Sequence, residues 1–392
     1  NNILNPDVLL TKNQRLHVEN IKTMPIVSDD IDLCVECGFC EPVCPSREIT
    51  MTPRQRIVVQ RELSLDNSDI SILNDYKYDA IETCATDGLC EIACPVNINT
   101  GEYIKTLKHD NVSSLKSSIS KWAANNFKYI QTFSRIMLRL GNIIDSLIGS
   151  TVLKVISIVF NKLFSTPIWN SSLPLVAPRI SSTDYNTRDK WVYFPSCVNR
   201  TLSGNSKKSS LGNVLYQISS KSGEAFRIPK NINSICCSQS FSSKGYKEAA
   251  KLIQKKTIDA LWESSDEGKV PIFVDTSPCT YQLLNPHLGL NESSIKKLEK
   301  MKIVDLVQYL KECVKNSELP KLDYDIAIHP TCSTEKMEQG TDLKTLAEIC
   351  CASVHLPKDW GCCGFAGDKG LHYPELNQAA TNYPTNDLKN IK

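Results

Sequence analysis

Four cysteines near the start of the chain are spaced in a way that suits metal binding. They are Cys34, Cys37, Cys40 and Cys44, and Pro45 follows directly. The run reads Cys-x2-Cys-x2-Cys-x3-Cys-Pro. Bacterial ferredoxins use this spacing for the thiolates that bind [4Fe-4S] clusters. Where two such clusters occur together, the fourth cysteine of a run ligates the other cluster. The run therefore predicts a second, similar run downstream.

A second run is present and repeats the spacing position for position. It consists of Cys84, Asp87, Cys90 and Cys94, followed by Pro95, so only the second ligand has changed. Disulfides or a structural zinc site are alternatives, although zinc sites commonly use separated Cys-x2-Cys pairs. Crossed ligation predicts cluster one at Cys34, Cys37, Cys40 and Cys94, and cluster two at Cys44, Cys84 and Cys90 with Asp87 at the fourth corner.

Asp87 has three possible roles at this corner. Its carboxylate could bind the fourth iron as an oxygen ligand, or the corner could lack a ligand and leave a [3Fe-4S] cluster. Asp87 could also be only a turn residue before Gly88, because Asp-Gly is common in turns. An oxidised three-iron cluster is paramagnetic and an oxidised four-iron cluster is not, so electron paramagnetic resonance separates these cases.

The composition of the chain limits its class and its partners. It has 392 residues, a formal net charge of +2 and 17 cysteines. This length suffices for two or three domains, and the balanced charge argues against nucleic acid as a partner. An odd number of cysteines with adjacent pairs suits metal ligation better than a secreted disulfide scaffold. No basic-then-apolar leader opens the sequence, so we expect a cytoplasmic location.

Local patterns divide the chain into four parts. Between the two cysteine runs, residues 53–75 predict a helix that begins at Pro53, with Thr50 and Thr52 as cap candidates. The four parts are an extended arm (1–30), the domain with both runs (31–110), amphipathic helices with a Pro- and Ser-rich linker (111–190) and an α/β domain (191–392).

The helices expected over residues 115–165 have a marked apolar pattern. The stretch 148–164 is interrupted by Lys154 and Lys162 and is shorter than the about 20 apolar residues that span a membrane. We therefore expect a helix packed on the protein, with a helix lying on a membrane surface as the alternative. The preceding apolar stripe, at helical spacing, consists of Ile130, Phe133, Met137, Leu140, Ile144 and Leu147.

The last part of the chain reads as an internal repeat of α/β units. Strands are expected over 191–194, 272–274 and 326–328, and helices over 244–263 and 295–315, which predicts a parallel or mixed sheet. Each unit opens with a strand that ends in a Pro-x-Cys sequence, and a Cys-Cys pair follows later. Such pairs at strand ends are expected to converge when the two units pack face to face.

The cysteines of this repeat predict a possible third metal or redox site. Buried, inert thiols are the alternative, since this is a common state of free cysteines. His329, three residues before the second unit's first cysteine, could be a ligand, a proton donor or a structural residue. The candidate thiols are Cys197, Cys236, Cys237 and Cys279 in the first unit, and Cys332, Cys362 and Cys363 in the second.

Several of these motifs together resemble the iron–sulfur half of bacterial FAD-linked D-lactate dehydrogenases. The resemblance covers nearly the whole chain except residues 111–190, and the paired-cysteine units are also similar to the cysteine-rich domain of heterodisulfide-reductase-like subunits. The motifs are Cys34-Val-Glu-Cys-Gly-Phe-Cys, Thr52-Pro-Arg-Gln-Arg, Thr83-Cys-Ala-Thr-Asp-Gly-Leu-Cys, Phe194-Pro-Ser-Cys-Val-Asn-Arg and Gly361-Cys-Cys-Gly-Phe-Ala-Gly-Asp.

The resemblance implies an α+β multidomain fold and an electron relay. A helical ferredoxin-like domain with two [4Fe-4S] clusters would precede a duplicated α/β cysteine-rich domain. Electrons would pass from FAD in a partner domain or subunit, through the clusters, to a quinone or cytochrome, with possible peripheral contact at the inner face of the cytoplasmic membrane. No convincing dinucleotide-binding glycine loop is found, so we expect this chain to lack the substrate-oxidising site.

Two departures from the resembling families leave alternatives open. Thr276 stands where a Cys-x2-Cys ending with Cys279 would be expected, and no cysteine follows Cys363. We therefore expect a C-terminally truncated domain and, before Asn5, a missing flavin domain. The alternatives are a heterodisulfide-reductase-like subunit, an iron–sulfur subunit of a glycolate or glycerol-3-phosphate dehydrogenase, or a stand-alone ferredoxin-like carrier.

Overall fold

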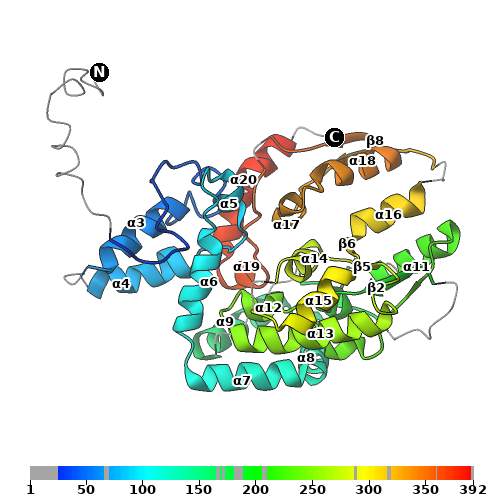
Figure 1. The fold of residues 1–392 in the computed structure, drawn as a ribbon, viewed down its shortest axis with the longest axis horizontal. Coiled ribbons are helices and arrows are strands. Elements are labelled where there is room, and N and C mark those ends of the chain that lie inside the picture. Colours follow the sequence, from blue (N-terminus) through cyan, green and yellow to red (C-terminus); the bar gives the residue numbers. More distant parts are fainter. Residues whose placement is uncertain are drawn as a thin grey trace.

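A helical part that contains both cysteine runs, three long helices and an α/β part make up the molecule (Figure 1). The predicted arm lies largely outside the described residues. The computed structural model describes residues 25–65, 70–164, 168–169, 173–180, 189–204, 210–286, 289–315, 319–358 and 360–389.

Short helices frame the two cysteine runs. The single helix predicted over 53–75 is wrong, because its first segment ends at Leu63, where the Ser64 hydroxyl donates to the carbonyl of Arg61 at 2.7 Å. The polar sequence after Leu63 favours turns over helix. The predicted start is confirmed, with Pro53 in the first turn and Thr52 as the cap. The elements are α3 (Pro53–Leu63), α4 (Ile70–Tyr76), the π-helical turn η1 (Lys77–Glu82), α5 (Leu89–Ala93) and α6 (Thr100–Asp110).

Equivalent glycines shape the two cysteine-bearing loops. Gly38 and Gly88 each follow the second ligand position of a run and have φ angles of 84° and 76°. A residue with a side chain is strained in this left-handed region, so glycine permits the turn at little cost. The repeat between the two runs thus extends from the ligands to the backbone conformation.

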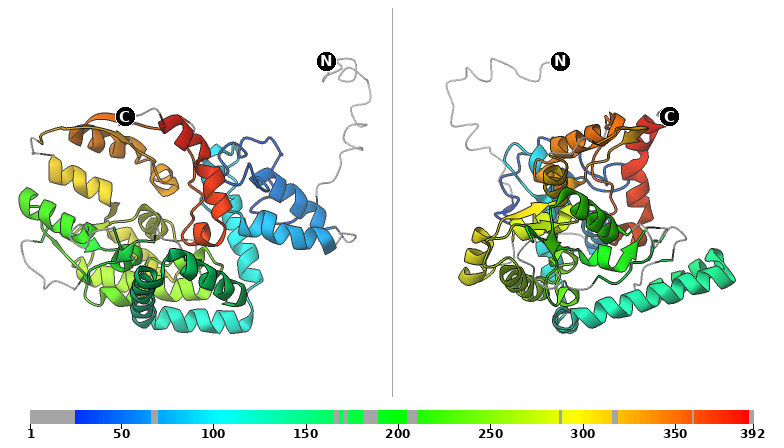
Figure 2. Two further views of the ribbon diagram at one scale, coloured as in Figure 1. Left: turned by 180° about the vertical axis from the view of Figure 1, so that it is seen from behind. Right: turned by 90° about the vertical axis from the view of Figure 1, so that its right-hand side faces the viewer.

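The region predicted as helical over 115–165 forms three helices. They are α7 (Ser114–Asn125), α8 (Phe127–Ile148) and α9 (Ser150–Phe164), and Gly149 with a φ of 85° separates the last two. Figure 2 shows α8 extending from the body of the molecule. The helix over 148–164 that was expected to pack on the protein is α9, and its Val155 and Val159 are instead 59% and 54% exposed. The apolar stripe of α8 is also exposed, with Phe133 at 61% and Leu147 at 77%. None of the described helices is long and apolar enough to cross a bilayer.

A four-stranded parallel sheet forms the core of the α/β part. Its order is β4 (Phe226–Arg227), β2 (Trp191–Phe194), β5 (Ile272–Val274) and β6 (Ile303–Asp305). The parallel sheet was predicted, and α13 (Lys247–Ser264) also lies close to its expected place. Helices α11 (Leu211–Ser222), α12 (Gln239–Ser242) and α14 (Ser277–Leu284) connect these strands, and a small antiparallel pair joins β1 (Leu175–Val176) to β3 (Leu202–Ser203).

The helix predicted over 295–315 is wrong, because strand β6 divides it. Helix α15 (Glu292–Lys300) ends before β6, and α16 (Leu306–Val314) begins directly after it. The β-branched residues Ile303 and Val304 pair with β5, and the carboxylate of Asp305 accepts from the Val307 N–H at 3.2 Å. Pairing with a neighbouring strand has therefore overridden the local helical pattern.

The second paired-cysteine unit contains a smaller described sheet. Strands β7 (Leu322–Ala327) and β8 (Cys351–His355) pair in parallel, and β8 was not predicted. The units share one local feature: Ser196 and Thr331 cap the helices that begin at Cys197 and Cys332. A duplicated arrangement of the whole domain stays a prediction. The helices here are α17 (Cys332–Lys336), α18 (Gly340–Cys350), α19 (Lys369–His372) and α20 (Pro374–Leu388), and α10 (Cys197–Thr201) is the counterpart of α17 in the first unit.

Three stacked aromatic rings form the centre of the main core. The ring of Phe273 lies 4.8 Å from that of Tyr193 and 3.8 Å from that of Tyr309, nearly parallel to both. All three side chains are fully buried. The sheet is therefore stabilised by contacts that join β2, β5 and α16.

We expect Phe273→Ala to lower the free energy of unfolding by about 3–5 kcal/mol, because the substitution leaves a cavity between two rings. Urea denaturation measures this loss. Tyr129→Ala is the control: this ring is 68% exposed on α8, and the change should stay within about 0.5 kcal/mol. Similar losses in the two variants would contradict the assignment of the core.

Candidate metal centre

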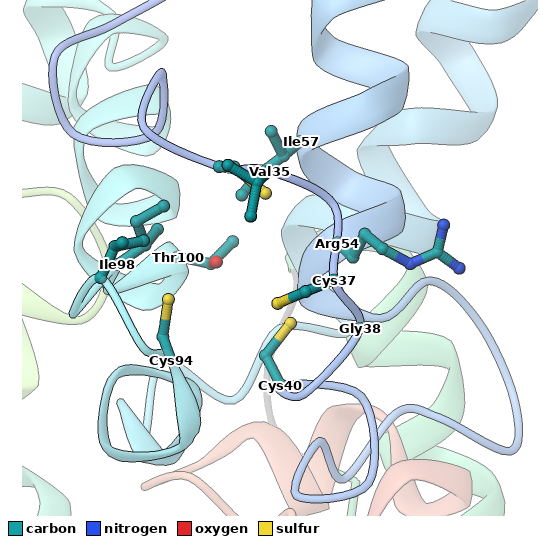
Figure 3. A pocket seen from close by; sticks show the side chains of 11 residues that line it. Val35, Cys37, Gly38, Cys40, Arg54, Ile57, Cys94, Ile98 and Thr100 are labelled. Atoms are coloured by element: carbon teal, nitrogen blue, oxygen red, sulfur yellow. The ribbon is translucent and has the colours of Figure 1, made fainter. Parts of the chain in front are cut away.

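The four residues predicted to hold cluster one surround a single pocket. Cys34, Cys37, Cys40 and Cys94 line it, although Cys94 comes from the second run. Figure 3 shows the sulfur atoms of Cys37, Cys40 and Cys94 directed toward the same space. Apolar and small residues complete the lining, namely Val35, Gly38, Ile57, Val96, Ile98 and Thr100, together with Arg54.

The pocket of cluster one lies close to the molecular surface. Cys37 is exposed, and Val35 and Phe39 beside it are 72% and 66% exposed. Cys40 is less accessible, and burial raises the pKa of its thiol to about 11. Metal binding requires the thiolate, so a bound cluster would have to displace this proton.

Helix α3 anchors the loop that carries the first three ligands. Arg61 donates to the carbonyl of Cys34 at 3.0 Å and pairs with Glu36 at the same distance. Arg54 pairs with Glu41 at 2.9 Å. Both arginines near cluster one are therefore neutralised by carboxylates from the loop itself.

The three thiols predicted for cluster two are buried around a single cation. Cys44, Cys84 and Cys90 are each less than 9% exposed, and Arg56 is 1% exposed among them. Its Nη1 donates to the sulfur of Cys44 at 3.6 Å. Burial by itself would lower the pKa of Arg56, but the negative thiolates of Cys84, Cys44 and Cys90 raise it.

This arrangement fits a negatively charged group at cluster two. Within the described part of the chain, no acidic side chain forms an ion pair with Arg56, whose other partners are Ser46 and the carbonyl of Ala80. A buried charge without a counter-charge is strongly destabilising. Thiolates on an iron–sulfur cluster would supply that counter-charge, so the donor set and the buried guanidinium are mutually compatible.

Asp87 lies between cluster two and the second paired-cysteine unit. Its carboxylate accepts from the Leu89 N–H at 2.8 Å, as in a turn. Burial raises the pKa of Asp87, while the bond to Leu89, a bond with Cys362 and the charges of Arg56 and Lys336 oppose this shift. The side chain thus interacts with a thiol of the other domain as well as facing its own run.

No group of three or more His, Cys, Asp or Glu side chains in the described ranges is arranged to hold a single metal ion. In a cubane cluster, each thiolate binds a different iron, so the ligands surround the cluster instead of meeting at one atom. The pocket lined by four cysteines is compatible with such a distribution.

The first paired-cysteine unit gathers its four thiols into one group. The sulfurs of Cys236 and Cys197 lie 3.9 Å apart, and those of Cys237 and Cys279 lie 2.8 Å apart. Cys197 and Cys279 lie in the first turns of α10 and α14, and Cys236 and Cys237 lie in the loop before α12. Arg200 is buried beside them and donates to the carbonyl of Ile235 at 2.7 Å.

The thiols of the second unit form a separate group beside Asp87. The thiols of Cys362 and Cys332 form a hydrogen bond. This bond is the main cause of the raised pKa of Cys362, and burial is the second cause. No hydrogen bond or sulfur–sulfur contact joins this group to the first unit's thiols among the described residues, so the expected convergence of all seven is not observed. His329 is exposed, which gives no support to its role as a ligand.

Cations of the second unit connect it to the cluster domain. The Lys369 amine donates to the carbonyl of Cys84 at 2.6 Å, and burial lowers the pKa of Lys369 to about 7. Lys336 pairs with Glu91 at 3.1 Å. Cys44 and Cys362 line the same small pocket between the two domains. Sequence patterns did not indicate these roles, nor that of Arg56, since each depends on residues distant in the chain.

Comparison with known proteins identifies two kinds of domain in this chain. A family model of a 4Fe-4S dicluster domain matches residues 30–98, and a model of a cysteine-rich domain matches residues 191–284 and 326–389. The chain thus combines an iron–sulfur dicluster domain with cysteine-rich domain sequence in a mixed fold of helices and sheets. These findings confirm the coarse fold class and the iron–sulfur assignment.

Two curated proteins are similar to the chain. It is 20% identical to the glycolate oxidase iron-sulfur subunit of Escherichia coli over 92% of its own length and 85% of the relative's. It is 31% identical to subunit C2 of the H(2)/formate:CoB-CoM heterodisulfide,ferredoxin reductase of Methanococcus maripaludis. That match covers 22% of this chain and less than half, 43%, of the relative. No solved structure shows a significant match.

Crossed ligation predicts which cysteine variants share a phenotype. We expect Cys94→Ala and Cys37→Ala to lose the same cluster, although the two residues belong to different runs. Iron and sulfide content should fall by one cluster in each, and the paramagnetic resonance spectra of the remaining cluster should be identical in the two variants, both oxidised and reduced. Cys350→Ala is the control, since Cys350 lies at the end of α18 and belongs to neither ligand set. If each run held its own cluster, Cys94→Ala would instead lose the same cluster as Cys84→Ala.

Proposed function

We propose that the chain is the iron–sulfur electron-transfer part of an oxidoreductase that acts on a small 2-hydroxy acid. A flavin-binding partner would oxidise the substrate and pass electrons to this chain. The observation that carries the proposal is the pair of adjacent ligand sets, one near the surface at Cys37 and one buried around Arg56. Iron–sulfur clusters, when bound, carry electrons one at a time.

The surface around cluster one supports an exchange of electrons with a partner. Leu33, Val35 and Phe39 are at least 66% exposed on the loop that carries the ligands. Exposed apolar patches often mark protein interaction sites. A partner bound to this loop would bring its own cofactor close to the ligand Cys37, which is also exposed.

The opposite end of the relay would lie at the cysteine-rich part. Helices α5, α19 and α20 cover the ligand set of cluster two. These helices exclude water from the ligands at this end of the proposed relay. A quinone or cytochrome as the final acceptor stays part of the proposal. The exposed apolar stripe of α8 is compatible with peripheral contact with a membrane, where a quinone would be found.

Similarity to the glycolate oxidase iron-sulfur subunit over 92% of the chain supports a 2-hydroxy acid as the substrate class. Within this class, we propose D-lactate from the motifs that resemble D-lactate dehydrogenases, with glycolate as the second candidate. A heterodisulfide-reductase-type role has weaker support, because that relative matches only 22% of the chain.

The proposal predicts that this chain accepts electrons from a reduced flavin but does not oxidise the substrate by itself. Anaerobically prepared chain with iron and sulfide should be brown, and photoreduced FAD should bleach its visible absorbance. The same preparation without a flavoprotein should not transfer electrons from D-lactate or glycolate to an artificial dye. Tagged chain isolated from its native cells should bring D-lactate:dye activity with it.

Three results would contradict this assignment. A colourless protein with zinc would exclude the relay, and dye reduction by the purified chain alone would place the substrate site within it. Cleavage of a mixed disulfide, without activity toward 2-hydroxy acids in the native preparation, would favour the heterodisulfide role. Apoprotein prepared without iron is the control for direct reaction between photoreduced FAD and the chain.

We also propose that cluster two has three irons, because Asp87 is engaged elsewhere. Its oxygen already accepts from Leu89, and it bonds with Cys362. These interactions make Asp87 a poorer iron ligand than a thiolate at the equivalent position of the first run.

The oxidised protein should therefore show the paramagnetic signal of a three-iron cluster. Asp87→Cys should convert it to a silent four-iron cluster and raise the iron content, while Asp87→Asn, the matched control, should keep the signal. Paramagnetic resonance and iron analysis of anaerobically prepared samples measure both effects. A silent oxidised wild-type protein with two full clusters would show that Asp87 is a ligand.

A further inference from the structure

Arg56 is, with Arg200, one of the two largest fully buried side chains among the described residues, and it reaches the second ligand set at Cys44. Helix α3 carries it, one turn after the cap at Thr52. Its Nε donates to the carbonyl of Ala80 at 2.9 Å, and its Nη2 donates to Ser46 at 2.7 Å. These bonds fix the guanidinium so that Nη1 meets the sulfur of Cys44 at 3.6 Å.

The charge of Arg56 has no carboxylate contact in the ranges that the structure describes. Ser46 and the carbonyl of Ala80 are neutral, and Asp87 acts on Arg56 only through a longer-range charge interaction. A buried cation without a carboxylate contact stabilises negative charge that is added nearby. The thiols that act on Arg56 are those of Cys44, Cys84 and Cys90, so a group that they hold would be stabilised when it gains negative charge.

Cluster one has a different electrostatic environment. Arg54 lines its pocket but pairs with Glu41 at 2.9 Å. Arg61 reaches the carbonyl of Cys34 but pairs with Glu36 at 3.0 Å. Each of these two cations is thus balanced by an anion, whereas the guanidinium of Arg56 has no carboxylate contact among the described residues.

We propose that Arg56 raises the reduction potential of cluster two and thereby makes it the electron sink of the pair. Reduction adds one negative charge, which an unpaired cation stabilises, and hydrogen bonds to ligand sulfurs also tune the potential. One electron would leave cluster one and be gained by cluster two, with no bond formed or broken and no proton moved. The proposal rests on the proposed function, because it requires both clusters to bind.

Redox titration of the anaerobically prepared protein, followed by paramagnetic resonance, tests the proposal. We expect Arg56→Met to lower the potential of cluster two enough to shift its one-electron equilibrium at least tenfold, which is about 59 mV. Arg56→Lys keeps the charge and should retain most of the wild-type potential. The potential of cluster one should not change in either variant, so it serves as an internal control.

Arg54→Met is the matched control from the same helix. It removes a paired cation beside cluster one and should leave the potential of cluster two unchanged. In the wild-type protein, cluster two should have the higher potential, and the Arg56 variants separate the effect of the guanidinium from that of the cluster type. The Cys94→Ala protein, which should keep only cluster two, assigns the two values.

Two results would overturn the role of Arg56. One is a wild-type protein in which cluster two has the same potential as cluster one or a lower one. The other is a potential of cluster two that stays the same in Arg56→Met, because its value would then have another cause. A protein that binds no iron–sulfur cluster would instead contradict the proposed function itself, which iron and sulfide analysis reveals before any titration.

Discussion

The structure depends on bringing thiols from two distant runs to common points. Cys94 joins Cys34, Cys37 and Cys40 around one pocket, and Cys44 joins Cys84 and Cys90 around Arg56. Neither predicted ligand set is complete without the other run, so binding of both clusters requires the two loops to lie together. Arg56 of α3 contacts both sides, since it binds the sulfur of Cys44 in the first run and the carbonyl of Ala80 shortly before the second.

The cysteine-rich part takes part in the same construction. Lys369 binds the carbonyl of the ligand Cys84, and Tyr78 of the cluster domain donates to Glu375 on α20 at 2.7 Å. These contacts cover one side of cluster two and leave cluster one near solvent. The thiols of the second unit then lie next to the buried cluster, through Asp87 and the pocket shared by Cys44 and Cys362.

Local rules predicted the iron–sulfur dicluster domain, because ligand spacing in a short loop is itself a local property. The same holds for the cap at Thr52 and for strands such as 191–194. Predictions failed where tertiary contacts decide the structure: β6 pairs with β5 inside a supposed helix, and apolar side chains of α9 are exposed instead of packed on the protein. The role of Arg56 could not be predicted either, since no local pattern reveals which thiols a buried arginine will meet.

The two ligand sets differ in charge balance as well as in depth. Near cluster one, Glu36 and Glu41 offset Arg61 and Arg54, so that surface site carries little excess charge. Near cluster two, the guanidinium of Arg56 is kept from water and from carboxylates in the described structure, so its field acts on the ligands with little screening. A difference in potential between the two sites thus requires no difference in their thiols. In the proposed relay, the five charged side chains on this helix and this loop would set the direction of electron transfer.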